Sequence, residues 1–257
     1  MGKITKPAIN FVSACIFWAA PIMALSSPAP AVPAGPDNTA VKFDPFEVLS
    51  SMPEAYSKVD DYTAIFHKRE RVDGELLPEE NILLKFKKPF KVYMKWLKGP
   101  HEGREALYVQ GMYKDKVIGH EGGFFGFVTM HMDPHGRLAM RGNRHPVTDA
   151  GIGRAIEIIT SDLKKGEAAN EQRLKAIGEE MLYGRKAWHI LMKLPPDGGY
   201  YAPEYDIWVD EELNLPVKIV IYGPGGELLE SYGYSDLRLN PGLSDAEFDP
   251  GYKGYSF

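Results

Sequence analysis

The sequence predicts a mainly β fold of the α+β class, a strongly curved antiparallel sheet with helices on its concave side. Three observations support this prediction: apolar and charged residues alternate along most of the chain after residue 61, two stretches have helical spacing, and Gly- and Pro-rich turn signals separate the alternating runs. Such alternation is typical of antiparallel strands with one face in a core and one in water. It argues against a doubly wound parallel sheet, whose strands are buried on both faces.

The first 25 residues of the 257-residue chain have the pattern of a signal peptide, with Lys3 and Lys6 before an apolar run that ends at Leu25. Small residues follow, so cleavage near Ala24 or Ser26 is expected, although a retained membrane anchor is the alternative. Residues 26–43 are rich in Pro and Ala and are interpreted as a disordered spacer. We therefore expect export to the periplasm.

Cys15 is the only cysteine and ends a Val-Ser-Ala-Cys sequence that is similar to the lipobox of lipoproteins. Only Ala8–Val12 would precede it as a hydrophobic core, and the apolar run continues beyond it. The favoured interpretation is a small residue within a signal peptide, and lipid anchoring at Cys15 is the alternative. Either way, residues 44–257 contain no thiol, which excludes disulfides and thiol chemistry there.

The charge balance is acidic, with 30 Lys and Arg against 35 Asp and Glu. Loss of Lys3 and Lys6 with the signal peptide would leave a net charge of −7. An acidic chain of this kind argues against nucleic acid as a main partner. The remaining residues 44–257 are enough for one sizeable core, and we expect a single domain.

Two helices are expected. The first begins at Asp44-Pro45, an N-cap acid followed by proline, and Pro53 should kink or split it. Its apolar face consists of Phe46, Leu49, Met52, Tyr56 and Val59. The second runs from Thr148 or Asp149 to Lys165, where Lys164, Lys165 and Gly166 form a C-terminal signal.

About six strands precede the second helix and about four follow it. The alternating segments before it cover residues from 62 onward, 80–88, 90–96, 104–110, 116–120 and 124–132; those after it cover 187–194, 205–210, 217–222 and 228–234. In 90–96, the apolar residues face a core and Lys91, Tyr93 and Lys95 face water. Gly223-Pro224-Gly225-Gly226 predicts a hairpin between the last two strands.

Known catalytic and metal-binding patterns are absent from the sequence. His120, His131, His135 and His145 fall close together, with Met130 and Met132 beside His131, and such residues can hold copper. However, Pro134 and Gly136 place His135 in a turn, and no zincin spacing occurs. No nucleophile elbow, phosphate loop or dinucleotide fingerprint is present. We expect a binding protein without a cofactor rather than an enzyme.

Five segments resemble an uncharacterised family of exported bacterial proteins that is similar to the LolA/LolB group of periplasmic lipoprotein carriers. They are Tyr62-Thr63-Ala64 with Phe66, Lys68 and Glu70; Lys85 through Trp96; Gly103-Arg104-Glu105-Ala106; Gly142 through Thr148; and Tyr234 through Leu243. The resemblance implies a LolA-like half-open β-barrel, covered by helices, whose apolar concavity holds acyl chains. No individual functional residue of LolA finds a match here, so none is carried over.

Two functional hypotheses follow. The first is a periplasmic carrier for a lipid or acylated protein, with an apolar cavity formed by Phe66, Leu84, Phe86, Val92, Met94, Trp96, Ile152, Ile156 and Ile159. In it, Met94 and Trp96 are wall residues and the second helix is a movable lid. The second is an envelope sensor that binds a protein of the inner or outer membrane. Its docking surface, for a protein partner or for lipid headgroups, would be Lys85, Lys87, Lys91 and Lys95, although such runs are more often a solvated strand face.

Overall fold

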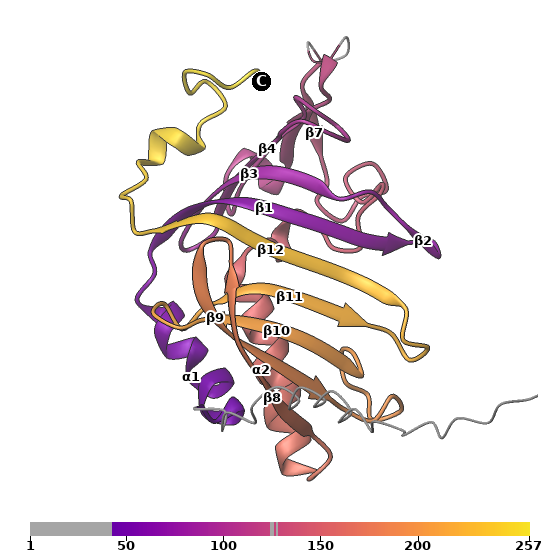
Figure 1. Ribbon diagram of the computed structural model, residues 1–257. Coiled ribbons are helices and arrows are strands. Elements are labelled where there is room, and N and C mark those ends of the chain that lie inside the picture. The colour runs from indigo at the N-terminus through magenta and orange to yellow at the C-terminus, as the bar shows by residue number, and fades with distance from the viewer. Residues whose placement is uncertain (1–42, 124–125, 127) are drawn as a thin grey trace, which may run out of the picture. The chain divides into compact units, whose positions relative to one another are not determined.

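The computed structural model describes residues 43–123, 126 and 128–257 (Figure 1). The predictions for the signal peptide, for Cys15 and for nearly all of the spacer lie outside these residues, and so does part of the predicted strand 124–132. The helices are α1 (Pro45–Ser57) and α2 (Ile152–Ala168), with short 3-10 helices η1 (Tyr113–Asp115), η3 (Val147–Asp149) and η4 (Asp245–Phe248). The strands are β1 (Asp61–Val72), β2 (Glu75–Leu76), β3 (Glu80–Lys87), β4 (Lys91–Trp96), β5 (Glu105–Val109), β6 (Val117–His120), β7 (Met130–Met132), β8 (Arg173–Leu182), β9 (Arg185–Lys193), β10 (Glu204–Asp210), β11 (Pro216–Tyr222) and β12 (Leu228–Leu239).

The strands form one antiparallel sheet in the order β7-β6-β5-β4-β3-β1-β12-β11-β10-β9-β8, and β2 pairs only with β1. The described strands β7 and β8 are the two edges and do not pair with each other, so the sheet does not close into a barrel. β1 and β12 lie at its centre, although β1 is the first strand along the described chain and β12 is the last. The predicted mainly β, antiparallel, open architecture is confirmed, and so is the hairpin at residues 223–226.

α1 begins where the sequence predicts. The Oδ1 atom of Asp44 accepts a hydrogen bond of 2.8 Å from the backbone N–H of Phe46, and Pro45 is the first helical residue. Pro53 lies within a single helix, so the prediction that it could split the helix was wrong. Leu49 and Met52 are fully buried on the inner face, and this packing offsets the hydrogen bond that proline removes.

α2 begins and ends later than predicted. Residues 147–149 form η3 instead of the first turn, and the helix starts after Gly151, whose φ of +108° favours glycine. Gly166 lies inside the helix rather than ending it. A Cβ atom on Gly166 would come within 2.7 Å of the side chain of Leu194, so a larger residue there would displace that side chain.

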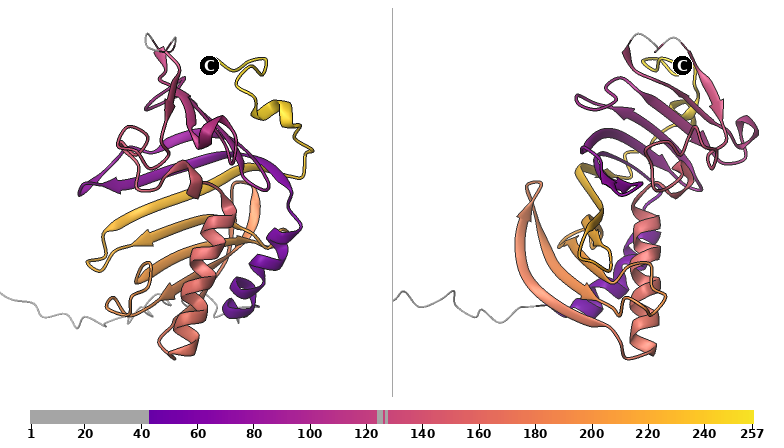
Figure 2. Two further views of the ribbon diagram at one scale, coloured as in Figure 1. Left: turned by 180° about the vertical axis from the view of Figure 1, so that it is seen from behind. Right: turned by 90° about the vertical axis from the view of Figure 1, so that its right-hand side faces the viewer.

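The main core lies between the two helices and one face of the sheet (Figure 2). α1 and α2 lie side by side on that face, and α2 packs Ile152, Ile156, Ile159 and Leu163 into the core, each no more than 3% exposed. α2 is therefore part of the core, which differs from its expected role as a movable lid.

A second apolar cluster lies on the opposite face of β4, β5 and β6. The C-terminal segment, residues 243–257, covers it, and the rings of Tyr93 and Tyr255 are stacked with centroids 3.7 Å apart. Tyr93 is only 1% exposed, so the prediction that this side of 90–96 faces water was wrong for Tyr93. Leu243 and Phe248 supply further apolar cover that the local sequence of β4 does not reveal.

Candidate functional site

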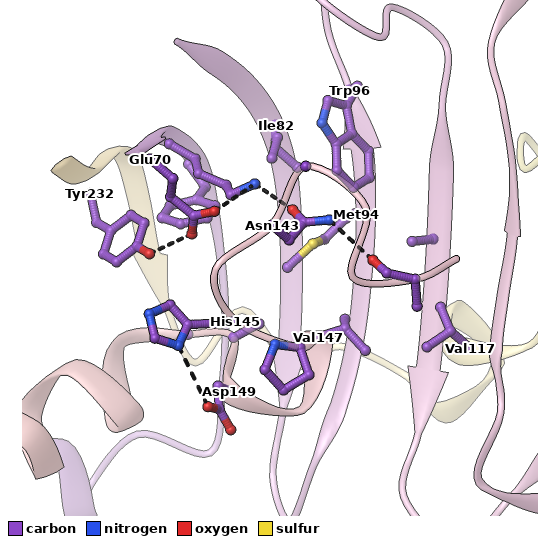
Figure 3. Close-up of a pocket in the computed structure, with 18 of the residues that line it drawn as sticks. Glu70, Ile82, Met94, Trp96, Val117, Asn143, His145, Val147, Asp149 and Tyr232 are labelled. Carbon is purple, nitrogen blue, oxygen red and sulfur yellow. Dashed lines mark hydrogen bonds and ion pairs between the residues drawn. The ribbon is translucent and has the colours of Figure 1, made fainter. Parts of the chain in front are cut away.

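A cavity of about 630 Å³ opens on the helix-bearing face of the sheet (Figure 3). It lies within the roughly 300–1,000 Å³ that is typical of small-molecule sites. Its walls come from the strands, from α2 and from the long connection between β7 and α2. The larger apolar side chains in the wall are Phe66, Leu77, Ile82, Met94, Trp96, Val117, Met130, Met132, Leu138, Val147, Ile158, Ile159, Ile219 and Ile221.

The residues proposed from the sequence for an apolar cavity divide into two groups. Phe66, Met94, Trp96 and Ile159 line the cavity. The others are in the filled core and do not line it: Leu84, Phe86, Val92, Ile152 and Ile156. The division follows position along the strands, because the Ile82–Trp96 pair of β3 and β4 lies at the cavity and the Phe86–Val92 pair does not.

The connection from Asp133 to Gly151, here called the cavity loop, forms much of the wall. It contributes seven apolar or small residues together with polar ones; the seven are Leu138, Ala139, Gly142, Pro146, Val147, Ala150 and Gly151. Periodicity could not identify this wall, because the loop has no repeating apolar pattern. The only sequence signal was the segment Gly142 through Thr148, quoted above for its resemblance to a family.

Two buried glutamates hold the cavity loop on the sheet. Glu70 on β1 accepts hydrogen bonds from the backbone N–H of Arg144, at 2.9 Å, and from the hydroxyl of Tyr232, at 2.5 Å. Glu230 on β12 accepts from Nε of Arg144, at 2.9 Å, and from the hydroxyl of Tyr201, at 2.5 Å. Glu70 and Glu230 are 4% and 1% exposed, so these contacts are shielded from water.

His145 and Lys68 complete this cluster. Nε2 of His145 lies 3.1 Å from Oε1 of Glu230, and its other ring nitrogen lies 3.9 Å from Asp149. Nζ of Lys68 lies 3.4 Å from Oε2 of Glu70 and donates to the side-chain oxygen of Asn143 at 2.5 Å. Burial would lower the pKa of His145, but the hydrogen bond and charge of Glu230 raise it overall. Burial would raise the pKa of Glu230, but hydrogen bonds from His145, Tyr201 and Arg144 lower it overall.

A second polar group lies beside Trp96. The guanidinium of Arg104 is 5.4 Å from the Trp96 ring centre and forms hydrogen bonds of 2.9 and 3.0 Å with Glu121. The indole Nε1 of Trp96 is buried and has no hydrogen-bond partner among the described residues. This part of the wall therefore combines a flat apolar surface with a polar edge.

The four lysines proposed as a docking surface lie near the C-terminal segment and each has an acidic partner. Lys85 pairs with Glu247 at 2.9 Å, and Lys87 and Lys91 pair with Asp245 at 2.9 and 2.7 Å. Lys95 lies 2.9 Å from the buried carboxylate of Glu105.

The histidines considered for a metal do not converge. His120 is buried in β6, His131 is exposed in β7, and His145 is in the glutamate cluster. Within residues 43–123, 126 and 128–257, no three His, Cys, Asp or Glu side chains are grouped so as to hold a metal ion. In the same part of the chain, no helix has the length and apolar character needed to cross a membrane.

Three solved structures to which this chain is similar share little sequence with it. The Mycobacterium tuberculosis lipoprotein LppX is 14% identical with a TM-score of 0.46, over 77% of this chain and 96% of LppX. The MucA/MucB complex of Pseudomonas aeruginosa gives 15% identity and a TM-score of 0.46, over 80% of this chain and 60% of the matched chain. A LolA superfamily protein of Nitrosomonas europaea gives 12% identity and a TM-score of 0.34, over 79% of this chain and 96% of that protein.

The search of curated proteins gives no match. One family model matches residues 59–257, which include both faces of the sheet, α2 and the cavity loop. The match confirms the expected membership of an uncharacterised family. The chain belongs to the family described as "Protein of unknown function (DUF1571)".

Proposed function

We propose that this protein is a periplasmic binding or carrier protein that holds a lipid, or the acyl chain of a lipoprotein, in the cavity between the sheet and the cavity loop. The observation that carries the proposal is the cavity itself, about 630 Å³ with walls of Met, Ile, Val, Phe and Trp. An acyl chain would be stabilised by roughly 25 cal/mol for each Å² of apolar surface removed from water.

The polar groups of the wall favour an amphiphile over a pure hydrocarbon. Trp96 Nε1 is buried without a hydrogen-bond partner among the described residues, and Arg104 and Glu121 lie beside it. A buried polar group that lacks a partner costs about 1–3 kcal/mol. An occupant that carries a carbonyl or hydroxyl group could remove part of this cost.

The test is native mass spectrometry of the protein purified from the cell envelope, followed by organic extraction and lipid analysis. We expect an acyl-bearing species at close to one copy per chain. A protein that is free of lipid and takes up no fluorescent fatty acid would refute the carrier proposal.

The alternative function is an envelope sensor that binds a membrane protein. In this alternative, the partner would have to displace the C-terminal segment, because its Asp245 and Glu247 pair with three of the four lysines proposed for docking. Pull-down from envelope extracts separates the two functions. A stoichiometric protein partner in the absence of lipid would support the sensor.

A further inference from the structure

The polar attachment of the cavity loop to the sheet is concentrated at one place. In the described part of the chain, the hydrogen bonds between residues 134–150 and the strands all involve Asn143, Arg144 or His145. The other hydrogen bonds of this stretch are within the loop itself or go to segments outside the sheet. The hydrogen bonds that attach the loop to the strands are therefore confined to one short segment, next to Val147 and Ala150, which pack against the core.

The partners of that segment are on the two central strands. Arg144 bonds the side chains of Glu70 on β1 and Glu230 on β12 and also donates to the backbone carbonyl of Arg71 at 3.0 Å. Glu70 and Glu230 are directly opposed in the β1–β12 register. Two opposed carboxylates repel each other, and burial increases this repulsion. Because Arg144, His145 and Lys68 supply the compensating positive charge, the two strands and the loop stabilise one another.

The cost of this arrangement argues for a specific role. A buried ion pair contributes little net stability compared with well-packed apolar residues, but loss of one partner is strongly unfavourable. The cluster also lies in the cavity wall, since Lys68, Glu70, Asn143, His145 and Glu230 all line the cavity. Because this cluster is stable only when all of its partners are in place, it is suited to hold the loop in one of two positions.

From these contacts we infer that the segment Asn143–His145, with Glu70 and Glu230, is a latch that keeps the cavity loop closed, and that ligand enters and leaves the cavity when this latch opens. The inference rests on the proposed function, because it assigns the control of access to the same cavity. α2 stays in place, since its inner face belongs to the core. The loop has turns at both ends that could absorb the movement, Asp133–Gly136 and the glycine at 151 with φ of +108°.

The first test measures opening without any ligand. The described residues contain no cysteine, so Ala139→Cys in the cavity loop provides a single thiol there, and Ala55→Cys in α1 is a matched control. Both variants carry Cys15→Ser in case the leader is retained. We expect Glu230→Gln to raise the rate of alkylation at position 139 by about tenfold, since a charge-assisted hydrogen bond is lost, and to leave position 55 unchanged.

The second test measures ligand exchange with a fluorescent fatty acid in stopped-flow experiments on the same full chain. Glu230→Gln is expected to raise the uptake and release rates together, with a much smaller change in Kd. Glu247→Gln is the matched control, because Glu247 pairs with Lys85 beside the C-terminal segment.

The outcomes distinguish the two proposals. If Glu230→Gln leaves both the alkylation rate and the exchange rates at wild-type values while fatty acid still binds, the latch is refuted and the carrier function stands. If neither the wild-type protein nor Glu230→Gln binds fatty acid, but alkylation at position 139 is still faster in the variant, the latch is supported and the carrier function is refuted. Circular dichroism and urea unfolding exclude a general loss of structure, and Glu70→Gln provides a second variant if Glu230→Gln does not fold.

Discussion

Glu70 and Glu230 face each other across the two central strands, with both carboxylates buried. Directly opposed like charges normally destabilise a strand pair. Here Glu70 accepts hydrogen bonds from Arg144 and Tyr232, and Glu230 accepts from Arg144 and Tyr201. The stability of the pairing between β1 and β12 thus depends on a loop that is far from both strands in sequence.

The first prediction concerns pH. Since the pKa of His145 is raised in the folded protein, its contribution to stability is complete below about pH 6.5 and is lost as pH rises through the folded pKa. Since the pKa of Glu230 is lowered, its contribution is present above its ordinary pKa of 4.5 and is lost in acid. His145→Gln should therefore lower the free energy of unfolding most near pH 6, by about 1.5–3 kcal/mol, and much less near pH 9.

The measurement is urea unfolding at several pH values, with His135→Gln on the exposed turn as the control. The groups that face His145 are Glu230, Asp149 and Tyr201, and Glu70 and Arg144 lie in the same cluster. If His145→Gln lowers the free energy of unfolding by the same amount at pH 6 and at pH 9, the predicted ion pair is contradicted.

The second prediction separates core from cavity wall on a single strand face. Leu84 is fully buried in the core, so Leu84→Ala should lower the free energy of unfolding by about 2–5 kcal/mol. Met94 is its cross-strand partner and lines the cavity, so Met94→Ala should cost less stability and reduce lipid retention. Urea unfolding measures the change in stability, and native mass spectrometry measures lipid retention. If the two substitutions change stability and lipid retention to a similar extent, the assignment of Leu84 to the core and Met94 to the cavity wall is contradicted.

The third prediction concerns the C-terminal segment. Hydrogen bonds from Lys91 and Lys87 lower the pKa of Asp245 to about 2. Lys91→Met should raise this pKa toward the usual value, as measured by NMR titration of the carboxyl carbon. Lys88→Met is the control, since the ammonium of Lys88 bonds the backbone carbonyl of Tyr56 instead. An unchanged Asp245 titration in Lys91→Met would show that the segment does not contact β4 in solution.

The fourth prediction concerns a hydrogen-bonded chain outside the cavity. His67 Nε2 lies 2.8 Å from the hydroxyl of Ser235, and Nδ1 lies 2.6 Å from the side-chain oxygen of Asn81. The connectivity is similar to that of a hydrolytic triad. However, the three residues are on neighbouring strands, none lines the cavity, and Tyr183 stacks on His67. We expect no labelling by a fluorophosphonate probe; labelling that Ser235→Ala abolishes would instead identify a serine hydrolase.

Much of the sheet could be predicted, because alternating apolar and polar residues indicate directly that a strand is buried on one face only. Sequence reasoning missed the two-residue strand β2 and the long strand β8, and in β8 the alternation is broken. Its pairing with β9 shifts register between Ala176 and Gly178, and most of its side chains are exposed at the sheet edge. A bulge reverses the phase of the pattern, so no single period describes residues 173–182.

The cavity could be predicted only in part, for a different reason. Alternation shows that Phe86 and Met94 face the same side of the sheet, but it does not show what lies above each of them. Phe86 stacks on Tyr62 in the core, whereas Met94 lies where the cavity loop leaves space. The glutamate cluster depends likewise on residues from β1, the loop and β12, which are more than 70 positions apart. Such contacts have no local sequence signal.

The polar attachments of the cavity loop at residues 143–145 are made to the two strands at the centre of the sheet. Arg144 bonds Glu70 and the backbone of Arg71 on β1 and bonds Glu230 on β12. The same contacts therefore hold the loop and compensate the opposed carboxylates of the strand pair. A substitution that loosens the loop is expected to lower the melting temperature as well, so the two quantities should change together across a series of variants of this cluster.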